Sequence, residues 1–144
     1  MINWTFEAGL QTSADIVQVA TDSKKIYNLF LKDNAVMTST SHLSGTDRVN
    51  EAVSKIGLND HDLIINVQGD EPFINPEDIN NLFDLVSKEQ ITMGTRYSDL
   101  KSLDELEDSN KVKILVNDGI ASNFFRETSL EKNIFIHQGV YAFK

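Results

Sequence analysis

Two adjacent carboxylates that follow a short apolar stretch are the clearest candidates for chemistry. Residues 63–67 are apolar except for one asparagine, and Gln68, Gly69, Asp70, Glu71 and Pro72 come directly after them. An apolar run of this length that ends in turn residues is typical of a buried parallel strand. Proline ends the strand because it has no N–H to donate. Asp70 is therefore expected just beyond the carboxyl end of a strand, where open α/β sheets bind ligands.

A lone carboxylate at this position suits Mg²⁺. This ion takes one or two protein carboxylates and completes its octahedron with water and substrate phosphates. The spacing alone leaves a second interpretation open, in which Asp70 and Glu71 only cap a turn before the next helix. His42 and His61 have no partner at the spacing of a metal site.

Composition and charge exclude several classes of protein. The chain has 144 residues, enough for one domain with a core, and is 40% hydrophobic and 24% charged. Its net charge of −9 argues against coating nucleic acid or an anionic membrane, since both require a basic patch. The absence of cysteine excludes disulfides and thiolate sites and fits a cytoplasmic protein. No membrane insertion is expected, because no apolar run is long enough to span a bilayer.

Over roughly the first ninety residues, strand patterns alternate with helix patterns. We expect strands at 15–20, 34–38, 63–67 and 91–96, and helices at 2–10, 24–31, 46–56 and from Pro76 onward. This alternation predicts βαβ units and a mostly parallel sheet. Thr46 or Asp47 is the expected cap of its helix, and the helix after Pro76 should bury Ile79, Leu82, Phe83, Leu85 and Val86.

The last third of the chain predicts antiparallel pairing as well. Asn117-Asp118-Gly119 lies between two strand-like runs, 112–116 and 120–125, which is a hairpin signal. A weak acidic helix is expected at 102–106, and a final strand at 134–143.

Several stretches, in the same order, resemble the family of 3-deoxy-manno-octulosonate (KDO) cytidylyltransferases, the CMP-KDO synthetases. They are residues 67–72 (VQGDEP), 19–22 (VATD), 41–48 (SHLSGTDR), 110–113 (NKVK), 124–126 (FFR) and 137–143 (HQGVYAF). The resemblance covers nearly all of the chain. It implies a Rossmann-like nucleotidyltransferase fold over residues 1–144, as a single domain that is incomplete at both ends.

The same resemblance implies the reaction and its partners. CTP would react with KDO to give CMP-KDO and pyrophosphate, in lipopolysaccharide synthesis, with Mg²⁺ as the cofactor. The anomeric oxygen of the sugar would attack the α-phosphorus in line, so the enzyme must align the partners and neutralise phosphate charge. A homodimer like those of the family is a further expectation.

By resemblance, each candidate residue receives a role. Asp70 would be the catalytic metal ligand, and Ser44, Gly45 and Arg48 would shape the cytosine side of the pocket. Gln68, Arg126, His137 and Tyr141 would bind the sugar, with the Arg126 guanidinium gripping its carboxylate through two parallel hydrogen bonds. Alternatives stay open: Gln68 as a buried hydrogen-bonding residue at the strand end, Arg126 as a surface residue paired with Glu127, and His137 as a structural residue.

The resemblance also implies segments that this sequence does not match. The family begins with a strand and a basic loop that holds the triphosphate, whereas residue 1 here corresponds to the helix after that loop. We therefore expect this polypeptide alone to bind CTP poorly and to have little activity. Two other interpretations remain: a related enzyme that resembles CMP-sialic acid synthetase, and a non-catalytic fragment or partner-binding remnant of the family.

Overall fold

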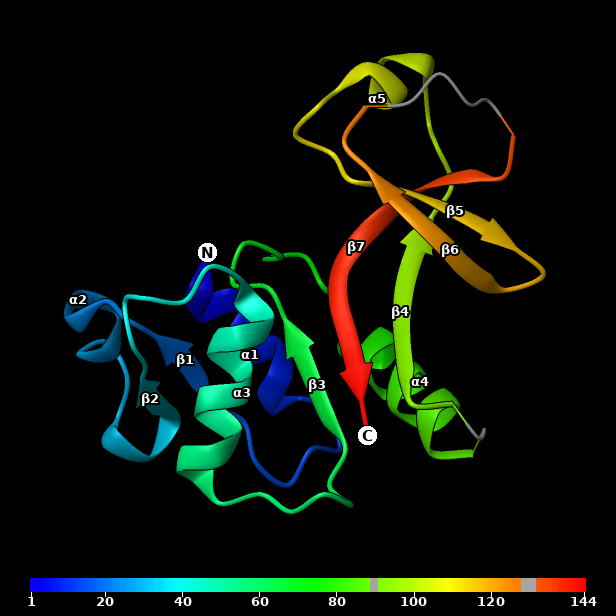
Figure 1. The fold of residues 1–144 in the computed structure, drawn as a ribbon. Helices are drawn as coiled ribbons and strands as arrows, with labels where there is room; N and C mark the ends of the chain where they lie inside the picture. Colours follow the sequence, from blue (N-terminus) through cyan, green and yellow to red (C-terminus); the bar gives the residue numbers. More distant parts are fainter. Residues whose placement is uncertain (89–90, 128–131) are drawn as a thin grey trace. The chain divides into compact units, whose positions relative to one another are not determined.

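The computed structural model describes residues 1–88, 91–127 and 132–144, and the chain divides into two compact units (Figure 1). Unit 1 contains Met1–Gly94 and Val140–Lys144, and unit 2 contains Thr95–Gly139. Strands β4 (Met93–Ser98) and β7 (Ile134–Phe143) contribute residues to both units. The single domain expected over residues 1–144 stays a prediction, and each unit is described here by itself.

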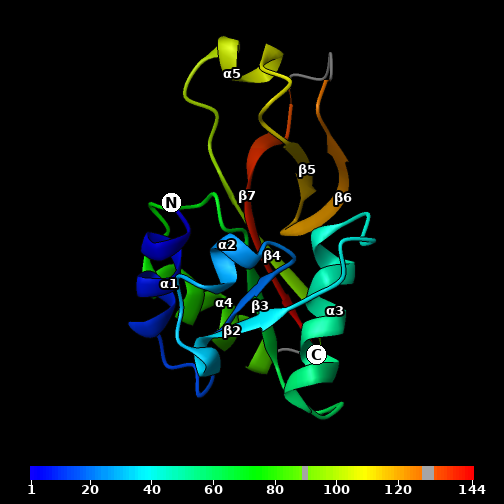
Figure 2. The ribbon, with the colours of Figure 1, turned by 90° about the vertical axis from the view of Figure 1, so that its left-hand side faces the viewer.

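Unit 1 is an α/β arrangement. Its helices are α1 (Ile2–Leu10), α2 (Lys24–Tyr27), α3 (Gly45–Ile56), α4 (Pro76–Lys88) and the 3₁₀ turn η1 (Lys32–Asn34). Its strands are β1 (Val19–Thr21), β2 (Ala35–Met37), β3 (Ile64–Val67), the first residues of β4 and the last residues of β7. Helices α1 and α4 lie on one side of the strands and α3 lies on the other (Figures 1 and 2). The strand expected at 15–20 begins only at Val19, and the helix expected at 24–31 ends at Tyr27.

The prediction of a mostly parallel sheet is wrong. Strands β1 and β2 are parallel, but they form a sheet of their own. Strand β3 is antiparallel to β7, with Ile64 opposite Phe143 and Val67 opposite Val140. The alternation of strands and helices predicts the elements correctly but not their pairing, because β3 pairs with the last strand of the chain.

One face of the β3–β7 pair carries the main core of unit 1. The buried residues Val140 and Ala142 pack with Leu82 and Val86 of α4. Leu82 and Val86 belong to the helix face that the sequence predicts to be buried, together with Ile79. Phe83 and Leu85 of the same prediction are 40% and 48% exposed, so the buried stripe of α4 is narrower than expected.

A second cluster holds α1 against β1 and β2. Phe6 packs with Val19 and Ala35, and its ring meets that of Phe30 edge-to-face, with centroids 5.0 Å apart. Such an aromatic pair stabilises by about 0.5–1.5 kcal/mol beyond its area burial. Ile26, Tyr27 and Phe30 pack against this cluster and so hold the short α2 and the turn that follows it.

Helix α3 begins earlier than the sequence predicts. The residue at its N-cap is Ser44, whose Oγ accepts a hydrogen bond from the Asp47 N–H, so the prediction of Thr46 or Asp47 as the cap is wrong. Thr46 and Asp47 lie inside the first turn, where an acid favours the helix dipole. The helix ends as expected at Gly57, with φ of 81°.

The loop that enters α3 is tied to the helix by Glu51. The Glu51 carboxylate accepts the backbone N–H of Ser39, contacts His42 Nε2 and pairs with Lys55 at 2.7 Å. Lys55 also donates to the Met37 carbonyl at the end of β2. The hydrogen bonds from Lys55, Ser39 and His42, in this order of size, lower the pKa of Glu51 from 4.5 to about 2.

Unit 2 is built on a hairpin. It contains α5 (Leu103–Glu107), β5 (Lys113–Asn117) and β6 (Ile120–Phe125), and β5 also pairs with the first residues of β7. The turn predicted at Asn117-Asp118-Gly119 is confirmed: Asp118 and Gly119 both have positive φ, 50° and 77°, as a type I′ turn requires. The final strand occupies 134–143, as predicted. No helix of the described part of the chain is long and apolar enough to cross a bilayer.

We expect Gly94→Ala to destabilise unit 1. A Cβ at Gly94 would lie 2.8 Å from Val86 Cγ2 and 2.9 Å from Leu82 Cδ1, and both side chains are buried. Overpacking of this kind costs about 1–3 kcal/mol, measurable as a lower free energy of unfolding in urea. Gly45→Ala is the matched control, since nothing lies within 4 Å of that Cβ. Equal stability of the two variants would contradict the packing described for α4.

We expect Glu51→Gln to lower stability at neutral pH but not near pH 2. The folded pKa lies below the ordinary value, so the contribution of the carboxylate is complete above pH 4.5 and disappears as the pH falls to about 2. The difference in the free energy of unfolding between wild type and variant should follow that course. Asp84→Asn breaks the exposed Lys88 pair on α4 and should have a small effect at every pH. A difference that is independent of pH would contradict the role of Glu51.

Candidate functional site

Asp70 and Gln68 lie where the sequence predicts, directly after the carboxyl end of β3. Asp70 is exposed in a turn, and the Gln68 carbonyl accepts the Glu71 N–H at 3.1 Å. The Gln68 side chain is also exposed. The interpretation of Gln68 as a buried residue at the strand end is therefore wrong, and both side chains are available to a ligand.

Gly69 shapes this turn by allowing α1 to come close. A Cβ on Gly69 would lie 2.8 Å from Ile2 Cδ1, and the Gly69 carbonyl accepts a hydrogen bond from Thr5 Oγ1 at 3.3 Å. The glycine thus fits the close approach of a helix to the backbone. Helix α1 supports the loop that carries Asp70.

The described residues contain no cluster of three or more acidic, histidine or cysteine side chains that could hold a metal ion. Asp70 is thus a single hard oxygen donor beside the half-buried Glu71. This donor set fits Mg²⁺, which usually keeps several waters and shares its remaining positions with substrate phosphates. It does not fit a metal that needs a complete cage of protein ligands.

Arg48 joins the carboxyl ends of β1 and β2 to α3. Its Nη2 donates to Asp22 Oδ2 at 2.9 Å, and its Nη1 donates to Thr38 Oγ1 at 2.7 Å. Asp22 directly follows β1 and Thr38 directly follows β2. The structure therefore gives Arg48 a positioning role that the sequence did not predict. The residues next to Asp22 and Thr38 in the sequence could not predict these hydrogen bonds, because Arg48 is distant in the chain.

Ser44 and Gly45 form the start of α3. The Ser44 hydroxyl donates to Asp47 Oδ2 at 2.7 Å and accepts the Asp47 N–H, so it is occupied by the helix cap. Gly45 leaves open space at the first turn of the helix. In Figure 1 the start of α3 and the carboxyl end of β3 both lie at the upper edge of unit 1. The start of α3, which holds Ser44 and Gly45, and the end of β3, which precedes Asp70, therefore lie at the same edge of unit 1 (Figure 1).

Tyr141 lies on β7, directly opposite Asn66 of β3. Cross-strand partners share a face of the sheet, so Tyr141 is on the face opposite the Val140 and Ala142 core. Its ring stacks with that of Phe143, and partial burial raises the pKa of Tyr141. The hydroxyl therefore keeps its proton at neutral pH and can donate a hydrogen bond.

The two remaining candidates, Arg126 and His137, belong to unit 2. Arg126 is exposed directly after β6, and its Nη1 donates to the Ser109 carbonyl at 3.2 Å. His137 is buried, lies 2.8 Å through Nε2 from Thr95 Oγ1, and meets Phe124 edge-on. Burial lowers the pKa of His137, which keeps the ring neutral at neutral pH. These contacts favour a structural role for His137 and leave most of the Arg126 fork accessible.

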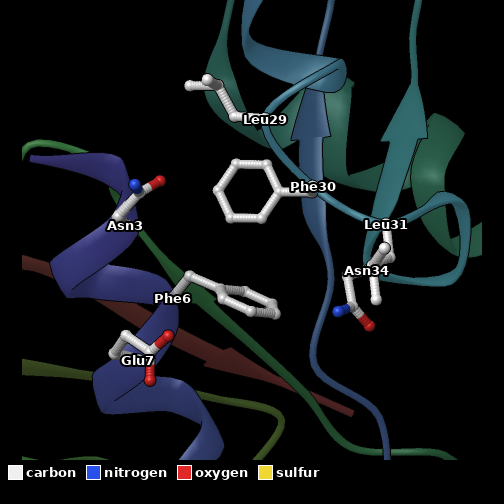
Figure 3. A pocket seen from close by; sticks show the side chains of 7 residues that line it. All are labelled: Asn3, Phe6, Glu7, Leu29, Phe30, Leu31 and Asn34. Atoms are coloured by element: carbon white, nitrogen blue, oxygen red, sulfur yellow. The ribbon is translucent and has the colours of Figure 1, made fainter.

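Two hollows in unit 1 contain none of the predicted site residues. The first, of about 220 Å³, is open and lies beside α1 (Figure 3). Its lining is Asn3, Phe6, Glu7, Leu29, Phe30, Leu31 and Asn34. The second, of about 450 Å³, is lined by α1 residues and by Pro72, Phe73, Ile74 and Pro76 of the turn after Asp70.

Comparison with known proteins identifies relatives of this chain. Two relatives are named 3-deoxy-manno-octulosonate cytidylyltransferase. The one from Fusobacterium nucleatum subsp. nucleatum is 32% identical over 154 residues, and the one from Francisella tularensis subsp. tularensis is 32% identical over 160. Each alignment covers 100% of this chain but only 62% and 64% of the relative. The chain thus spans less than two thirds of these relatives.

A solved structure supports the fold. The structure of CMP:2-keto-3-deoxy-manno-octonic acid synthetase complexed with CTP matches with a TM-score of 0.84 and 30% identity, over 99% of this chain and 62% of that one. The α/β class predicted from the sequence is confirmed by this match. Residues 1–138 also match the family described as Cytidylyltransferase. The chain therefore belongs to the cytidylyltransferase family.

Proposed function

We propose that the protein transfers CMP from CTP to KDO and releases pyrophosphate. In this reaction the anomeric oxygen of the sugar forms a bond to the α-phosphorus and loses its proton. The bond from that phosphorus to the bridging oxygen breaks, and its electron pair leaves with pyrophosphate. The observation that supports the proposal is that the start of α3, with Ser44 and Gly45, and the end of β3, before Asp70, lie at the same edge of unit 1 (Figure 1).

The nucleotide side of the proposal rests on the start of α3. Open space at Gly45 allows a flat base or a sugar to approach the backbone. The first turn of a helix also offers N–H donors and a positive dipole end. Arg48 is proposed to position α3, because its hydrogen bonds to Asp22 and Thr38 hold this helix against the ends of β1 and β2.

Asp70 is the residue proposed to hold Mg²⁺. The bound ion would supply charge neutralisation for the phosphates of CTP. Asp70 contributes a carboxylate that is exposed and fixed at the strand end by the Gly69 turn. One protein carboxylate is sufficient for an ion that arrives with its nucleotide.

On the sugar side, Arg126 is proposed to bind the carboxylate of KDO. Its planar guanidinium offers five donors in a fixed fork, and one of them is used by Ser109. By family resemblance, Tyr141 and Gln68 are proposed as hydrogen-bonding residues for sugar hydroxyls. His137 is proposed as a buried, neutral residue with a structural role. The family resemblance extends the proposal to a homodimer in the cytoplasm that acts in lipopolysaccharide synthesis.

We expect pyrophosphate release by this chain to be slow and to require CTP, KDO and Mg²⁺ together. Asp70→Asn keeps the size of the side chain but removes the charge, and should lower the rate at least about 100-fold, or about 2.7 kcal/mol. Asp60→Asn removes the same charge from an exposed turn before β3 and should leave the rate unchanged. Equal rates in the two variants would contradict the role of Asp70. A higher rate with N-acetylneuraminate than with KDO would favour a CMP-sialic acid synthetase.

We expect Arg126→Ala to raise the KM for KDO without changing the KM for CTP. A hydrogen bond to a charged group contributes about 1.5–3 kcal/mol, so the KM for KDO should rise at least about tenfold. Arg126→Lys keeps the charge but not the fork, and should recover only part of the loss. Steady-state kinetics with each substrate varied in turn separate the two KM values. A parallel rise in both, or full recovery by lysine, would contradict bidentate recognition of the sugar carboxylate.

A further inference from the structure

Unit 2 contains a lysine that is completely buried. Lys113, the first residue of β5, has no exposed surface. An ammonium group removed from water is costly unless each of its protons finds an acceptor. Lys113 Nζ meets this requirement with three backbone carbonyls, those of Asp108 at 2.6 Å, Lys111 at 3.1 Å and Arg126 at 2.5 Å. Its three donors are therefore all used by main-chain oxygens.

These carbonyls belong to two segments that are distant in the sequence. Asp108 and Lys111 bound a tight turn, in which the Lys111 N–H donates to the Asp108 carbonyl and the Asp108 side chain accepts from Asn110. Arg126 follows β6 directly, because its neighbour Phe125 is the strand partner of Lys113. Lys113 thus links the end of β6 to the 108–111 turn by hydrogen bonds.

The Arg126 side chain also contacts the 108–111 turn. Its Nη1 donates to the carbonyl of Ser109, which lies between the two turn carbonyls bound by Lys113. The backbone of Arg126 is therefore held by Lys113, and its guanidinium is held by a turn that Lys113 also holds. Removing the ammonium group would remove the hydrogen bonds that hold both the Arg126 backbone and the turn to which the guanidinium binds.

We propose that Lys113 is a positioning residue for Arg126, which sets the direction of the guanidinium fork for the carboxylate of the sugar substrate. The inference rests on the proposed function, since it assigns Arg126 to the KDO carboxylate. Lys113 does not contact the substrate, because it is buried. Its effect is on orientation, and misplacement of a binding group by a small distance can cost up to about 100-fold.

The test compares Lys113→Met with Lys111→Met. Both changes remove one lysine charge near the 108–111 turn, but Lys111 is 41% exposed at its side chain and pairs with Glu105 instead of the Arg126 carbonyl. In separate titrations, each without the second substrate, Lys113→Met should raise the Kd for KDO at least about tenfold and leave the Kd for CTP within about twofold. Lys111→Met should change neither, and Lys113→Arg should recover part of the KDO affinity.

A double-mutant cycle with Arg126→Ala separates positioning from general destabilisation. If Lys113 acts through Arg126, the double variant should bind KDO no more weakly than Arg126→Ala alone. Losses that add, or a folded Lys113→Met variant with wild-type KDO affinity, would overturn the proposal. If Arg126→Ala itself leaves KDO affinity unchanged, the sugar assignment fails and the inference fails with it.

A measurement on the unaltered protein applies even if Lys113→Met does not fold. The protons of a buried ammonium group exchange slowly, so its ¹⁵N–¹H signal can be observed by NMR. Titration with KDO should shift the signals of Arg126 Nε and Lys113 Nζ together and leave Lys111 Nζ unmoved. A shift at Arg126 without a shift at Lys113 would overturn the proposal.

Discussion

A single guanidinium holds together the parts of unit 1 that the proposed nucleotide site needs. Arg48 bonds to Asp22 after β1 and to Thr38 after β2, and it stands in the first turn of α3. The two strands have only three residues each, so their ladder alone is a weak support. A charge-assisted bond that is partly buried is stronger than an exposed pair. The position of Ser44 and Gly45 therefore depends on Arg48.

Unit 2 uses the same principle with a different cation. Lys113 is completely buried and gives its three protons to carbonyls, among them that of Arg126. In each unit a basic side chain that is expensive to bury is satisfied by groups from separate segments. Each cation therefore fixes a loop that carries residues of the proposed reaction, although neither is required to touch a substrate.

Local signals in the sequence predicted the elements well but not their partners. The Asp118-Gly119 turn and the helix start at Pro76 were predictable, because each depends on the backbone preferences of adjacent residues. The pairing of β3 with β7 was not, since it joins residues far apart in the chain. The position of Asp70 after a strand followed from its neighbours. The burial of Lys113 could not be predicted from the sequence, because a lysine at the start of a strand usually faces solvent.

The most direct test of the account is an NMR titration of the ¹⁵N-labelled protein with CTP and Mg²⁺ at millimolar concentration, which detects weak binding. The account predicts that the amide signals of Ser44, Gly45 and Asp70 shift with CTP, and that Mg²⁺ strengthens the shift at Asp70. Signals of Phe6 and Phe30, beside the hollow in Figure 3, should stay in place. Shifts confined to Phe6 and Phe30, with none at the strand ends, would contradict the proposed nucleotide site.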